Sequence, residues 1–568
     1  MRRFFVCILV AATGCGSAGL EDLDHVMDAR DTAKEALPSE QSDVGLEQAP
    51  LEATSETMPE ALPEEVLPPE PKLNYIVVAE DDLIAPAMAH AAWREGLGYK
   101  TKVYRVSELV GGSIEPDALL KAVQGVVAAA KADVGEGHPL FLVLYGDAPG
   151  TFDHSGKQIP AIPCINESMA GAGCATDNTY GDVDGDGVPE AAVGRIPVFT
   201  EAQAAAFLEK AKGFESQYEN GLWNRRVAVY TGVGGFGAEI DGLIEGVTMD
   251  ALKRVSHAFD IVGAYANPSS PYYYTPFEEK VVELFNGGSL LTVYVGHGSS
   301  GSMQGLTGDQ IDQIKCEHRL PFALFFACLT GNYPADEPSI AEQVLALPRG
   351  PIAVFASTDI SHPYANAVFV YEAQRVLLDE RPKTFGEAMM RAKWALMHHE
   401  DDFRQLMDTV ATVQVPWDQQ ERLRRQHLDL YNLLGDPATP MHYPATNAAF
   451  DPVQGKMPNG PLHVSGEVPD MASGLAFITL ETERDVILQK LDPVDPKNPD
   501  PATVQANWEK AVNKVVVSKT VPVNSSHFEA DLEVPEDLPT GTYYVKVYAD
   551  GVTVDGARSD GFGFVEAP

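Results

Sequence analysis

The sequence predicts an α/β protein whose parallel sheet is built in two subdomains, followed by a separate all-β domain. Short apolar runs bounded by Gly or Pro, such as residues 290–295 and 322–327, are typical of strands buried on both faces. Helical segments alternate with these runs as far as about residue 443, which predicts parallel strands in one sheet. From about Pro444 onward, alternating apolar and polar residues replace the helical pattern and indicate a domain made of strands.

The expected elements follow in chain order. The first subdomain (73–217) should hold strands at 74–82, 100–106, 140–144 and 191–196 and helices at 84–95 and 116–131. The second (218–445) should hold strands at 226–231, near 259, and at 290–295, 322–327 and 351–357, with helices around 310–314 and over 385–397. The last domain (446–568) should hold strands at 476–482, 514–521, 528–532 and 542–549, and its late hairpin is typical of an immunoglobulin-like sandwich.

Length and charge limit the functions to consider. The chain has 568 residues, which is too long for one domain and enough for two or three. Its net charge of -41 argues against nucleic acid as a partner, because phosphates are bound by Lys and Arg.

Residues 1–15 have the pattern of a bacterial export signal. Arg2 and Arg3 precede an apolar segment that is too short to span a membrane. The ending Ala-Thr-Gly-Cys resembles a lipobox with Cys15 as the lipidated residue, so we expect an outer-membrane lipoprotein of the cell envelope or an extracellular protein. An ordinary signal peptide cleaved near residues 16–18 is the alternative. Residues 16–72 are acidic and Pro/Glu-rich, which predicts a disordered tether or, alternatively, a propeptide.

His297 and Cys328 come directly after two of the predicted strands, in the segments Gly-His-Gly and Ala-Cys-Leu-Thr-Gly. The crossover between them should make the two strands parallel, so both residues lie at the sheet edge where reactive groups of α/β proteins collect. A thiol and an imidazole there predict a cysteine nucleophile with a His base or ion-pair partner. The amides of Gly298 and Cys328 are candidates for an oxyanion hole. Without side chains, Gly296 and Gly298 would let a substrate backbone approach His297.

These two motifs, GHGS and ACLTGNY, resemble the gingipain-type cysteine peptidases of family C25, whose catalytic domain is caspase-like. The resemblance covers roughly residues 73–443 and includes four further stretches, PLFLVLYGD, TDNTYGDVDGDGVPEAAVGRIPV, FGEAMMRAKWAL and YNLLGDPATP. It implies a cysteine endopeptidase that acts on proteins or peptides without a catalytic cofactor and carries an immunoglobulin-like domain after the catalytic one. It also implies that Glu190 is the acid that supports the catalytic His.

Asp182, Asp184 and Asp186 alternate with other residues in Asp-Val-Asp-Gly-Asp-Gly. Carboxylates at this spacing are typical of a calcium loop, so the sequence predicts structural Ca²⁺ there. The loop is not an EF-hand, because Val193 occupies the position of the bidentate Glu. A polar turn before the strand at 191–196 is the alternative. Glu190 is a candidate for two roles, in the metal loop and as the acid that supports the catalytic His, and one carboxylate is not expected to serve both.

The cysteines predict one disulfide and one free nucleophile. In an exported chain Cys164 and Cys174 are expected to pair. Cys316 is expected to pack in the crossover, which leaves Cys328 as the free thiol that a nucleophile must be.

The segment Gly-Val-Gly-Gly-Phe-Gly at 232–237, with Asp260 about 20 residues further on, matches the dinucleotide-binding fingerprint. Export, the lack of a second domain for a reductase site and the peptidase resemblance argue against this interpretation. We therefore expect a glycine-rich loop near the active site. A surface adhesion or scaffold protein with a vestigial catalytic pair is the other alternative.

Asp359 is the sole carboxylate in the loop 357–362, which follows the strand after Cys328. The resemblance implies that this loop contributes to the pocket for the residue before the cut bond. An acidic group there would bind Arg or Lys through charge-assisted bonds. An Asp that caps the following turn or helix is the alternative.

Overall fold

The structure is a computed structural model and describes residues 73–111, 115–135, 138–148, 158–166, 174–233, 251–412, 415–451, 453 and 460–567. All of these residues belong to one compact unit. The predicted export signal, Cys15 and the acidic segment 16–72 lie outside the described residues. In the part that is described, no helix has the length and apolar character that crossing a membrane requires.

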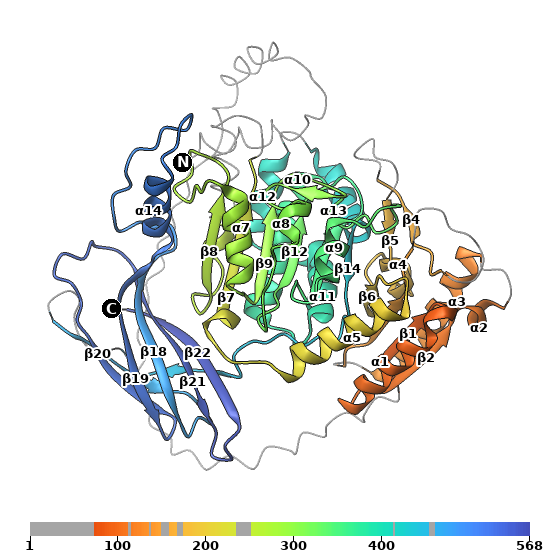
Figure 1. Cartoon of the computed structure of the whole chain (residues 1–568), viewed down its shortest axis with the longest axis horizontal. Helices are drawn as coiled ribbons and strands as arrows, with labels where there is room; N and C mark the ends of the chain where they lie inside the picture. Colours follow the sequence, from red (N-terminus) through yellow and green to blue (C-terminus); the bar gives the residue numbers. More distant parts are fainter. Residues whose placement is uncertain are drawn as a thin grey trace, which may run out of the picture. The chain divides into compact units, whose positions relative to one another are not determined.

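A ten-stranded sheet extends through both predicted subdomains (Figure 1). In the order in which they lie side by side, its strands are β2 (Thr101–Arg105), β1 (Tyr75–Ala79), β3 (Phe141–Tyr145), β6 (Ala192–Ile196), β14 (Tyr431–Leu434), β13 (Ala353–Ser357), β12 (Phe322–Phe326), β9 (Leu291–Val295), β7 (Arg226–Thr231) and β8 (Asp260–Tyr265). The strands expected in both subdomains are present, and most begin and end within two residues of the predicted positions. Their order in space differs from their order in the chain: β1 lies between β2 and β3, β14 between β6 and β13, and β7 between β8 and β9.

Strand β14 joins the two halves of the sheet and reverses its direction. It pairs in parallel with β6 and antiparallel with β13. The sequence predicted a sheet of parallel strands, and β14 makes the sheet mixed. The amino end of β6 therefore lies at the same edge as the carboxyl ends of β13, β12 and β9. The sequence did not predict β14, because a helix ends at Leu430 and the strand begins at Tyr431 with no Gly or Pro between them.

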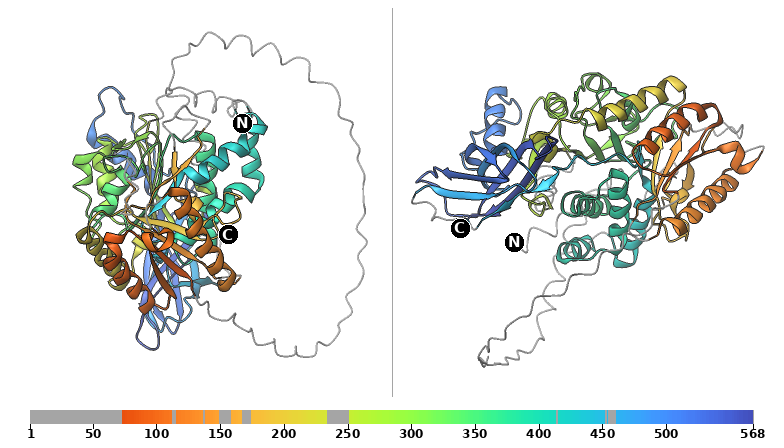
Figure 2. Two further views of the ribbon diagram at one scale, coloured as in Figure 1. Left: turned by 90° about the vertical axis from the view of Figure 1, so that its right-hand side faces the viewer. Right: turned by 90° about the horizontal axis from the view of Figure 1, so that it is seen from below.

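Helices cover both faces of the sheet (Figure 2). They are α1 (Ile84–Gly96), α2 (Val106–Val110), α3 (Pro116–Val134), α4 (Asn178–Gly181), α5 (Glu201–Ser216), α7 (Phe277–Asn286), α8 (Gly308–Ile311), α9 (Ile340–Ala346), α10 (Pro363–Arg375), α11 (Phe385–His398), α12 (Asp402–Ala411) and α13 (Trp417–Leu430), with the short turns η5 (Asp81–Leu83), η6 (Leu222–Arg225) and η7 (Val376–Glu380). Successive residues of a strand point to opposite faces. Accordingly, Tyr75 and Val77 of β1 pack with α1 and α5, while Ile76 and Val78 pack with α3.

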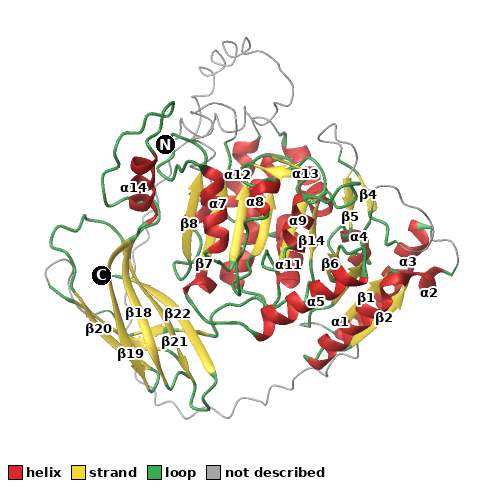
Figure 3. Cartoon of the chain, in the orientation of Figure 1, coloured by secondary structure: helices red, strands yellow, loops and turns green. Residues whose placement is uncertain are grey.

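The C-terminal domain is a nearly closed sheet of eight strands (Figure 3). Across the sheet they are β15 (Thr446–Asn447), β22 (Arg558–Glu566), β21 (Tyr543–Val552), β18 (Ser473–Thr482), β19 (Val515–Asn524), β20 (His527–Leu532), β17 (Leu462–Glu467) and β16 (Ala449–Phe450). Both ends of this order come from one short stretch of chain, in which Ala448 N donates to Phe562 O at 2.9 Å. Alternating residues, such as Ala476, Ile478 and Leu480, form its core. The predicted all-β domain is confirmed.

This domain packs against β8, the outer strand of the large sheet. Trp508 of α14 (Pro501–Val512) donates from Nε1 to Gly263 O at 2.9 Å, and α14 lies beside β8 in Figure 1. Arg484 Nη2 donates to Phe259 O at 3.1 Å and to Ser256 O at 2.7 Å. An open strand edge is a site for unwanted pairing with other chains. The C-terminal domain therefore protects this edge of the large sheet.

Candidate functional site

His297 and Cys328 follow two strands that lie side by side. β9 and β12 pair in parallel with Val295 opposite Phe326, and Gly296 N donates to Phe326 O at 3.4 Å. His297 and Cys328 each lie two residues beyond this last pair. His297 is exposed and Cys328 is half-buried, so solvent reaches both side chains. The structure thus brings the imidazole and the thiol to neighbouring positions on one edge of the sheet.

Gly296 and Gly298 let the His297 segment pack against its neighbours. A Cβ on Gly298 would lie 2.8 Å from Cys328 O and 2.6 Å from a methyl carbon of Thr330. A Cβ on Gly296 would lie 2.6 Å from the hydroxyl of Tyr294, which donates to His297 O at 2.7 Å. Real Cβ atoms do not approach other atoms this closely. Close packing is thus a second reason for these glycines, besides the substrate access expected from the sequence.

The chain turns back directly after Cys328 through a residue in an unfavourable conformation. Leu329 has φ 61°, in the left-handed region that side chains other than Gly, Asn and Asp rarely adopt. Such a residue costs on the order of 1–3 kcal/mol and persists where its surroundings fix it. Here Leu329 N donates to Asp359 O at 3.1 Å, and Gly331 N donates to Ser357 O at 2.8 Å. These bonds tie the turn to the end of β13 and fix the position of the Cys328 backbone.

The thiol of Cys328 contacts a residue that the sequence did not single out. Cys328 Sγ lies 3.9 Å from both the carbonyl oxygen and the hydroxyl of Ser361, which is buried in the loop after β13. A single Ser in a loop forms no pattern in the sequence, so nothing marked it. Cys316, in contrast, is fully buried, and burial raises the pKa of its thiol to about 12.

A small hairpin supports the loop after β13. Its strands are β4 (Ile162–Cys164) and β5 (Cys174–Thr176), and a disulfide joins Cys164 to Cys174 with their Cα atoms 5.0 Å apart. Asn166 Nδ2 donates to Asp359 Oδ2 at 3.0 Å and to Ile360 O at 2.8 Å. Asp359 is 1% exposed, so its carboxylate lies beneath the surface of the loop. The hairpin therefore contacts the loop after β13, where Thr358 Oγ1 donates to Ala175 O at 2.7 Å, and Asn166 just after β4 binds one oxygen of the predicted pocket carboxylate.

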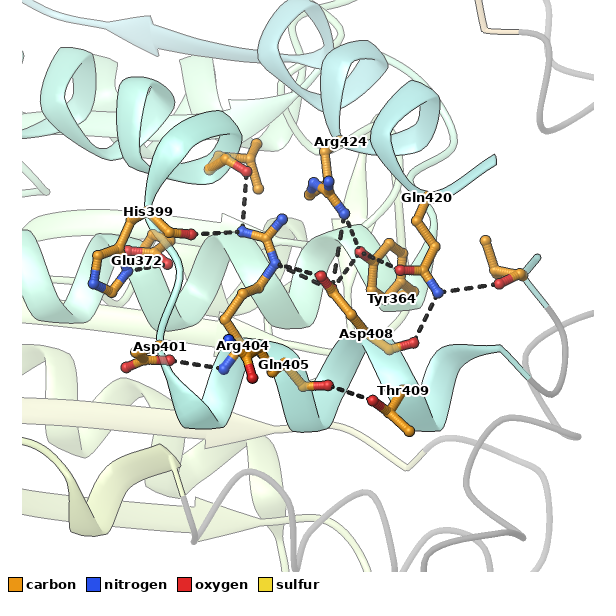
Figure 4. A network of polar contacts seen from close by, with 12 residues as sticks. Tyr364, Glu372, His399, Asp401, Arg404, Gln405, Asp408, Thr409, Gln420 and Arg424 are labelled. Carbon is orange, nitrogen blue, oxygen red and sulfur yellow. Dashed lines mark hydrogen bonds and ion pairs between the residues drawn. The ribbon is translucent and has the colours of Figure 1, made fainter. Parts of the chain in front are cut away.

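A buried polar network holds the start of α10, which follows this loop (Figure 4). The hydroxyl of Tyr364 donates to Asp408 Oδ1 at 2.7 Å and receives a bond from Arg424. Arg404 Nε donates to both carboxylate oxygens of Asp408 at 3.1 Å. His362 N donates to the imidazole Nε2 of a residue on α13, His427, at 2.8 Å. Helices α12 and α13 therefore fix the chain on the far side of Ser361.

Three carboxylates in and after the Asp182 loop lie close together, but they are not the three that were predicted as calcium ligands. Oxygens of Asp182, Asp184 and Glu190 lie within 4.8 Å of one another. Asp186 is not in this group, because its carboxylate folds back and accepts a bond from Val188 N at 2.7 Å. Burial raises the pKa of Asp182 and of Glu190. Carboxylate oxygens are the ligands that Ca²⁺ prefers, so Asp182, Asp184 and Glu190 fit such an ion.

Glu190 lies at the same edge of the sheet as His297, but far along it. Three strands separate β6 from β9, and at about 4.8 Å per strand their ends are about 19 Å apart. Glu190 Oε2 accepts a bond from Val183 N at 2.7 Å, within its own loop. This position favours the metal-loop role of Glu190 over the role of orienting His297.

The residue expected to serve as the dinucleotide acid, Asp260, lies away from the glycine-rich segment. Asp260 is the first residue of β8 and pairs with Arg226 at the amino end of β7, whereas Gly232 follows the carboxyl end of β7. Burial raises the pKa of Asp260, but Lys546 and Arg225 overcome this and hold it below its usual value. The fingerprint interpretation of Asp260 is therefore wrong, because acid and glycines lie at opposite edges. Residues 234–237 of the motif lie outside the described residues.

Several motifs of the resemblance stabilise the framework under the site. Arg195 is fully buried and binds both carboxylate oxygens of Asp177, at 2.6 and 2.7 Å. Its guanidinium also lies 4.9 Å from the ring centre of Tyr333, which follows the Cys328 turn. Asp436 is bonded to three buried side chains of the first subdomain, Tyr75 on β1 and His90 and Arg94 on α1. These charged residues therefore connect the two halves and do not contact the thiol.

Comparisons with known proteins agree with this architecture. The pattern of peptidase family C25 matches residues 68–442. Gingipain R2 of Porphyromonas gingivalis is 24% identical over 339 residues, which cover 56% of this chain and 42% of gingipain R2. The chain thus spans less than half the length of this relative.

Two solved structures are similar over most of the chain. One, described as "Structure of Protease", covers 87% of this chain and 97% of its own at 13% identity, with a TM-score of 0.51. The crystal structure of the Arg-specific cysteine proteinase gingipain R (RgpB) covers 87% and 98% at 17% identity, with a TM-score of 0.49. The first likeness shows the fold. The family match, which extends over more than half of the chain and includes both strand ends described above, shows that the chain belongs to peptidase family C25.

Proposed function

We propose that the protein is an exported cysteine endopeptidase in which Cys328 is the nucleophile and His297 the base. The observation that carries this proposal is the parallel register of β9 and β12, which ends both strands at one edge beside these two residues. The strained turn at Leu329 supports it, because backbone strain of this kind is found at functional sites.

The reaction follows from the groups at this edge. Cys328 Sγ attacks the carbonyl carbon of the peptide bond, and the amides of Gly298 and Cys328 donate to the oxygen as it gains charge. His297 takes the thiol proton and gives it to the leaving amine as the C–N bond breaks. Water then hydrolyses the thioester, with its proton passing through His297, and the thiol is restored.

Further features of the proposal concern location, metal and substrate. Export, with Cys15 as a lipid anchor, is proposed from residues 1–15 alone. Structural Ca²⁺ is proposed for Asp182, Asp184 and Glu190. Cleavage after Arg or Lys is proposed from Asp359, whose main chain is bonded to the Cys328 turn.

Paired substitutions of the two free cysteines among the described residues test the proposal. Cys328→Ala should abolish both the cleavage of a peptide library and labelling by a thiol-alkylating peptide probe. Cys316→Ala, at the fully buried thiol, should retain both. Full activity in Cys328→Ala would refute the mechanism. A native protein that is labelled at Cys328 but cleaves nothing would indicate a scaffold with a vestigial pair.

A further inference from the structure

A chain of polar side chains runs from the hydrophobic core to the thiol of Cys328. The hydroxyl of Tyr431 donates to Asn366 Oδ1 at 2.7 Å, and Asn366 Nδ2 donates to Ser361 Oγ at 2.7 Å. Ser361 Oγ lies 3.9 Å from Cys328 Sγ. The chain joins β14, α10 and the loop after β13, so segments far apart in the sequence converge beneath the proposed nucleophile.

The hydrogen bonds of this chain have a defined direction. The phenol of Tyr431 binds the amide oxygen of Asn366, which turns the amide nitrogen toward Ser361. Ser361 Oγ accepts that bond and still has its own hydrogen to donate. Two acceptors lie within its reach, the Tyr431 phenol and Cys328 Sγ. A thiolate is the stronger of these acceptors, because hydrogen bonds to charged groups are stronger than neutral ones.

The core end of the chain packs against the strand that precedes the proposed nucleophile. Tyr431 is fully buried, and its ring packs against Phe326, Phe355 and Phe369 with ring centres 5.4, 5.5 and 5.4 Å away. Phe326 is the last residue of β12, two residues before Cys328. The same aromatic cluster therefore holds both the strand that carries the thiol and the phenol that orients Asn366.

We propose that Ser361 is a positioning residue whose hydroxyl, oriented by Asn366 and Tyr431, donates to the Cys328 thiolate and favours the reactive anion. The carbonyl oxygen of Ser361 also lies 3.9 Å from Sγ and can accept a bond from the neutral thiol. One residue thus offers an acceptor to the thiol and a donor to the thiolate. Ser361→Ala removes the donor and keeps the acceptor. The inference rests on the proposed role of Cys328 as nucleophile.

The test is the pH dependence of iodoacetamide alkylation, followed by mass spectrometry on the peptide that contains Cys328. In Ser361→Ala we expect the rate at pH 7 to fall about tenfold, because a hydrogen bond to a charged group is lost. The limiting rate at high pH should stay unchanged. Tyr431→Phe should lower the rate at pH 7 about threefold, because the Asn366 amide loses the neutral bond that orients it.

Other titratable groups near the thiol are His297 after β9, Asp359 and His362 in the loop after β13, and Tyr431 on β14. The first three are unchanged in both variants, so a shift of the profile in Ser361→Ala reports the hydroxyl. Ser357→Ala is the matched control, because this buried hydroxyl of the same loop donates to Asp359 O at 2.8 Å and not to the thiol.

Unchanged profiles in Ser361→Ala would overturn the proposal. If Ser361→Ala does not fold, Tyr431→Phe decides alone, and an unchanged profile in that variant would overturn it. The same shift in Ser357→Ala would also overturn it, because the effect would then come from the loop as a whole. Alkylation does not require peptidase activity, so failure of this inference is distinguishable from failure of the proposed function.

Discussion

The two free cysteines of the α/β domain flank the same strand and have opposite surroundings. Cys316 lies before the amino end of β12, where Cys316 N donates to Arg349 O at 2.8 Å and no part of the residue is exposed. Cys328 lies after the carboxyl end of the same strand and is half-buried. Burial raises the pKa of the Cys316 thiol to about 12, so this thiol behaves as a small apolar side chain.

The difference shows that the edge of the sheet, more than the residue type, makes a cysteine available for chemistry. At the amino edge, loops close over Cys316, and Lys210 nearby donates to the carbonyls of Leu345 and Pro351 at 2.7 Å. At the carboxyl edge, solvent reaches Cys328 and the neighbouring His297, and reactive groups of α/β sheets generally collect at this edge.

Selective alkylation should show the largest difference. At pH 8 we expect iodoacetamide to modify Cys316 about a thousandfold more slowly than a thiol with an ordinary pKa near 8.5, because only the thiolate reacts. Since the pKa of Cys316 is raised, its rate should rise about tenfold for each pH unit toward pH 12. Mass spectrometry of the two cysteine peptides measures both rates in one sample. As the control, the two cysteines should be alkylated at equal rates in guanidinium chloride. Equal rates in the native protein would contradict the predicted difference between Cys316 and Cys328.

Substitution of the imidazole should have the next largest effect. His297→Ala should lower the turnover of a peptide substrate by about two orders of magnitude, because a positioned acid–base group is lost. His318→Ala is the matched control, since His318 is exposed two residues after the buried Cys316. Similar turnover in His297→Ala and in the native protein would leave Cys328 without a partner and contradict the proposed pair.

Most elements of the fold were predictable from local patterns. Buried parallel strands are short apolar runs, so β7, β9, β12 and β13 were located within two residues. The direction of the sheet halves was not predictable, because it depends on β14, which touches β6 at the pair Leu434 and Arg195. The four residues of β14 directly continue helix α13, so the sequence shows no boundary there. The pairing of β14 with β6 joins residues far apart in the sequence and leaves no local pattern.

The site was predictable where reactive residues follow strands, and not where it depends on tertiary packing. The neighbouring positions of His297 and Cys328 were predicted from their strand ends, and the structure confirms these positions. Ser361, Asn366 and Tyr431 were missed, because their roles arise from three separate elements that converge. Glu190 was assigned through the resemblance alone, and its position depends on the number of strands between β6 and β9, which a sequence does not give.

The third prediction tests whether the buried carboxylate beside the Cys328 turn selects the substrate. Asp359→Asn should lower kcat/KM about tenfold for peptides with Arg or Lys before the cut bond, because a charge-assisted bond is replaced by a neutral one. Peptides with small residues there should be cleaved as before, and Asp336→Asn, at an exposed carboxylate after the Cys328 turn, should change neither. An equal loss for all peptides would assign Asp359 to the support of the loop through Asn166.

The smallest effect is expected at Glu190, which shares a sheet edge with His297 and Cys328 but lies on the other half of the sheet. Glu190→Gln should change turnover by less than about threefold, because about 19 Å separates the ends of β6 and β9. We expect Ca²⁺ to raise the melting temperature of the native protein, since a ligand that binds the folded state stabilises it by mass action, and we expect the variant to lose this rise. Asp186→Asn is the control, because Asp186 lies outside the cluster and should keep most of that rise. A hundredfold loss of turnover with the calcium response intact would mean that Glu190 does reach His297. In that case both halves of the sheet would contribute to catalysis. The difference in reactivity between Cys316 and Cys328 would then depend on more than their positions at the two ends of β12.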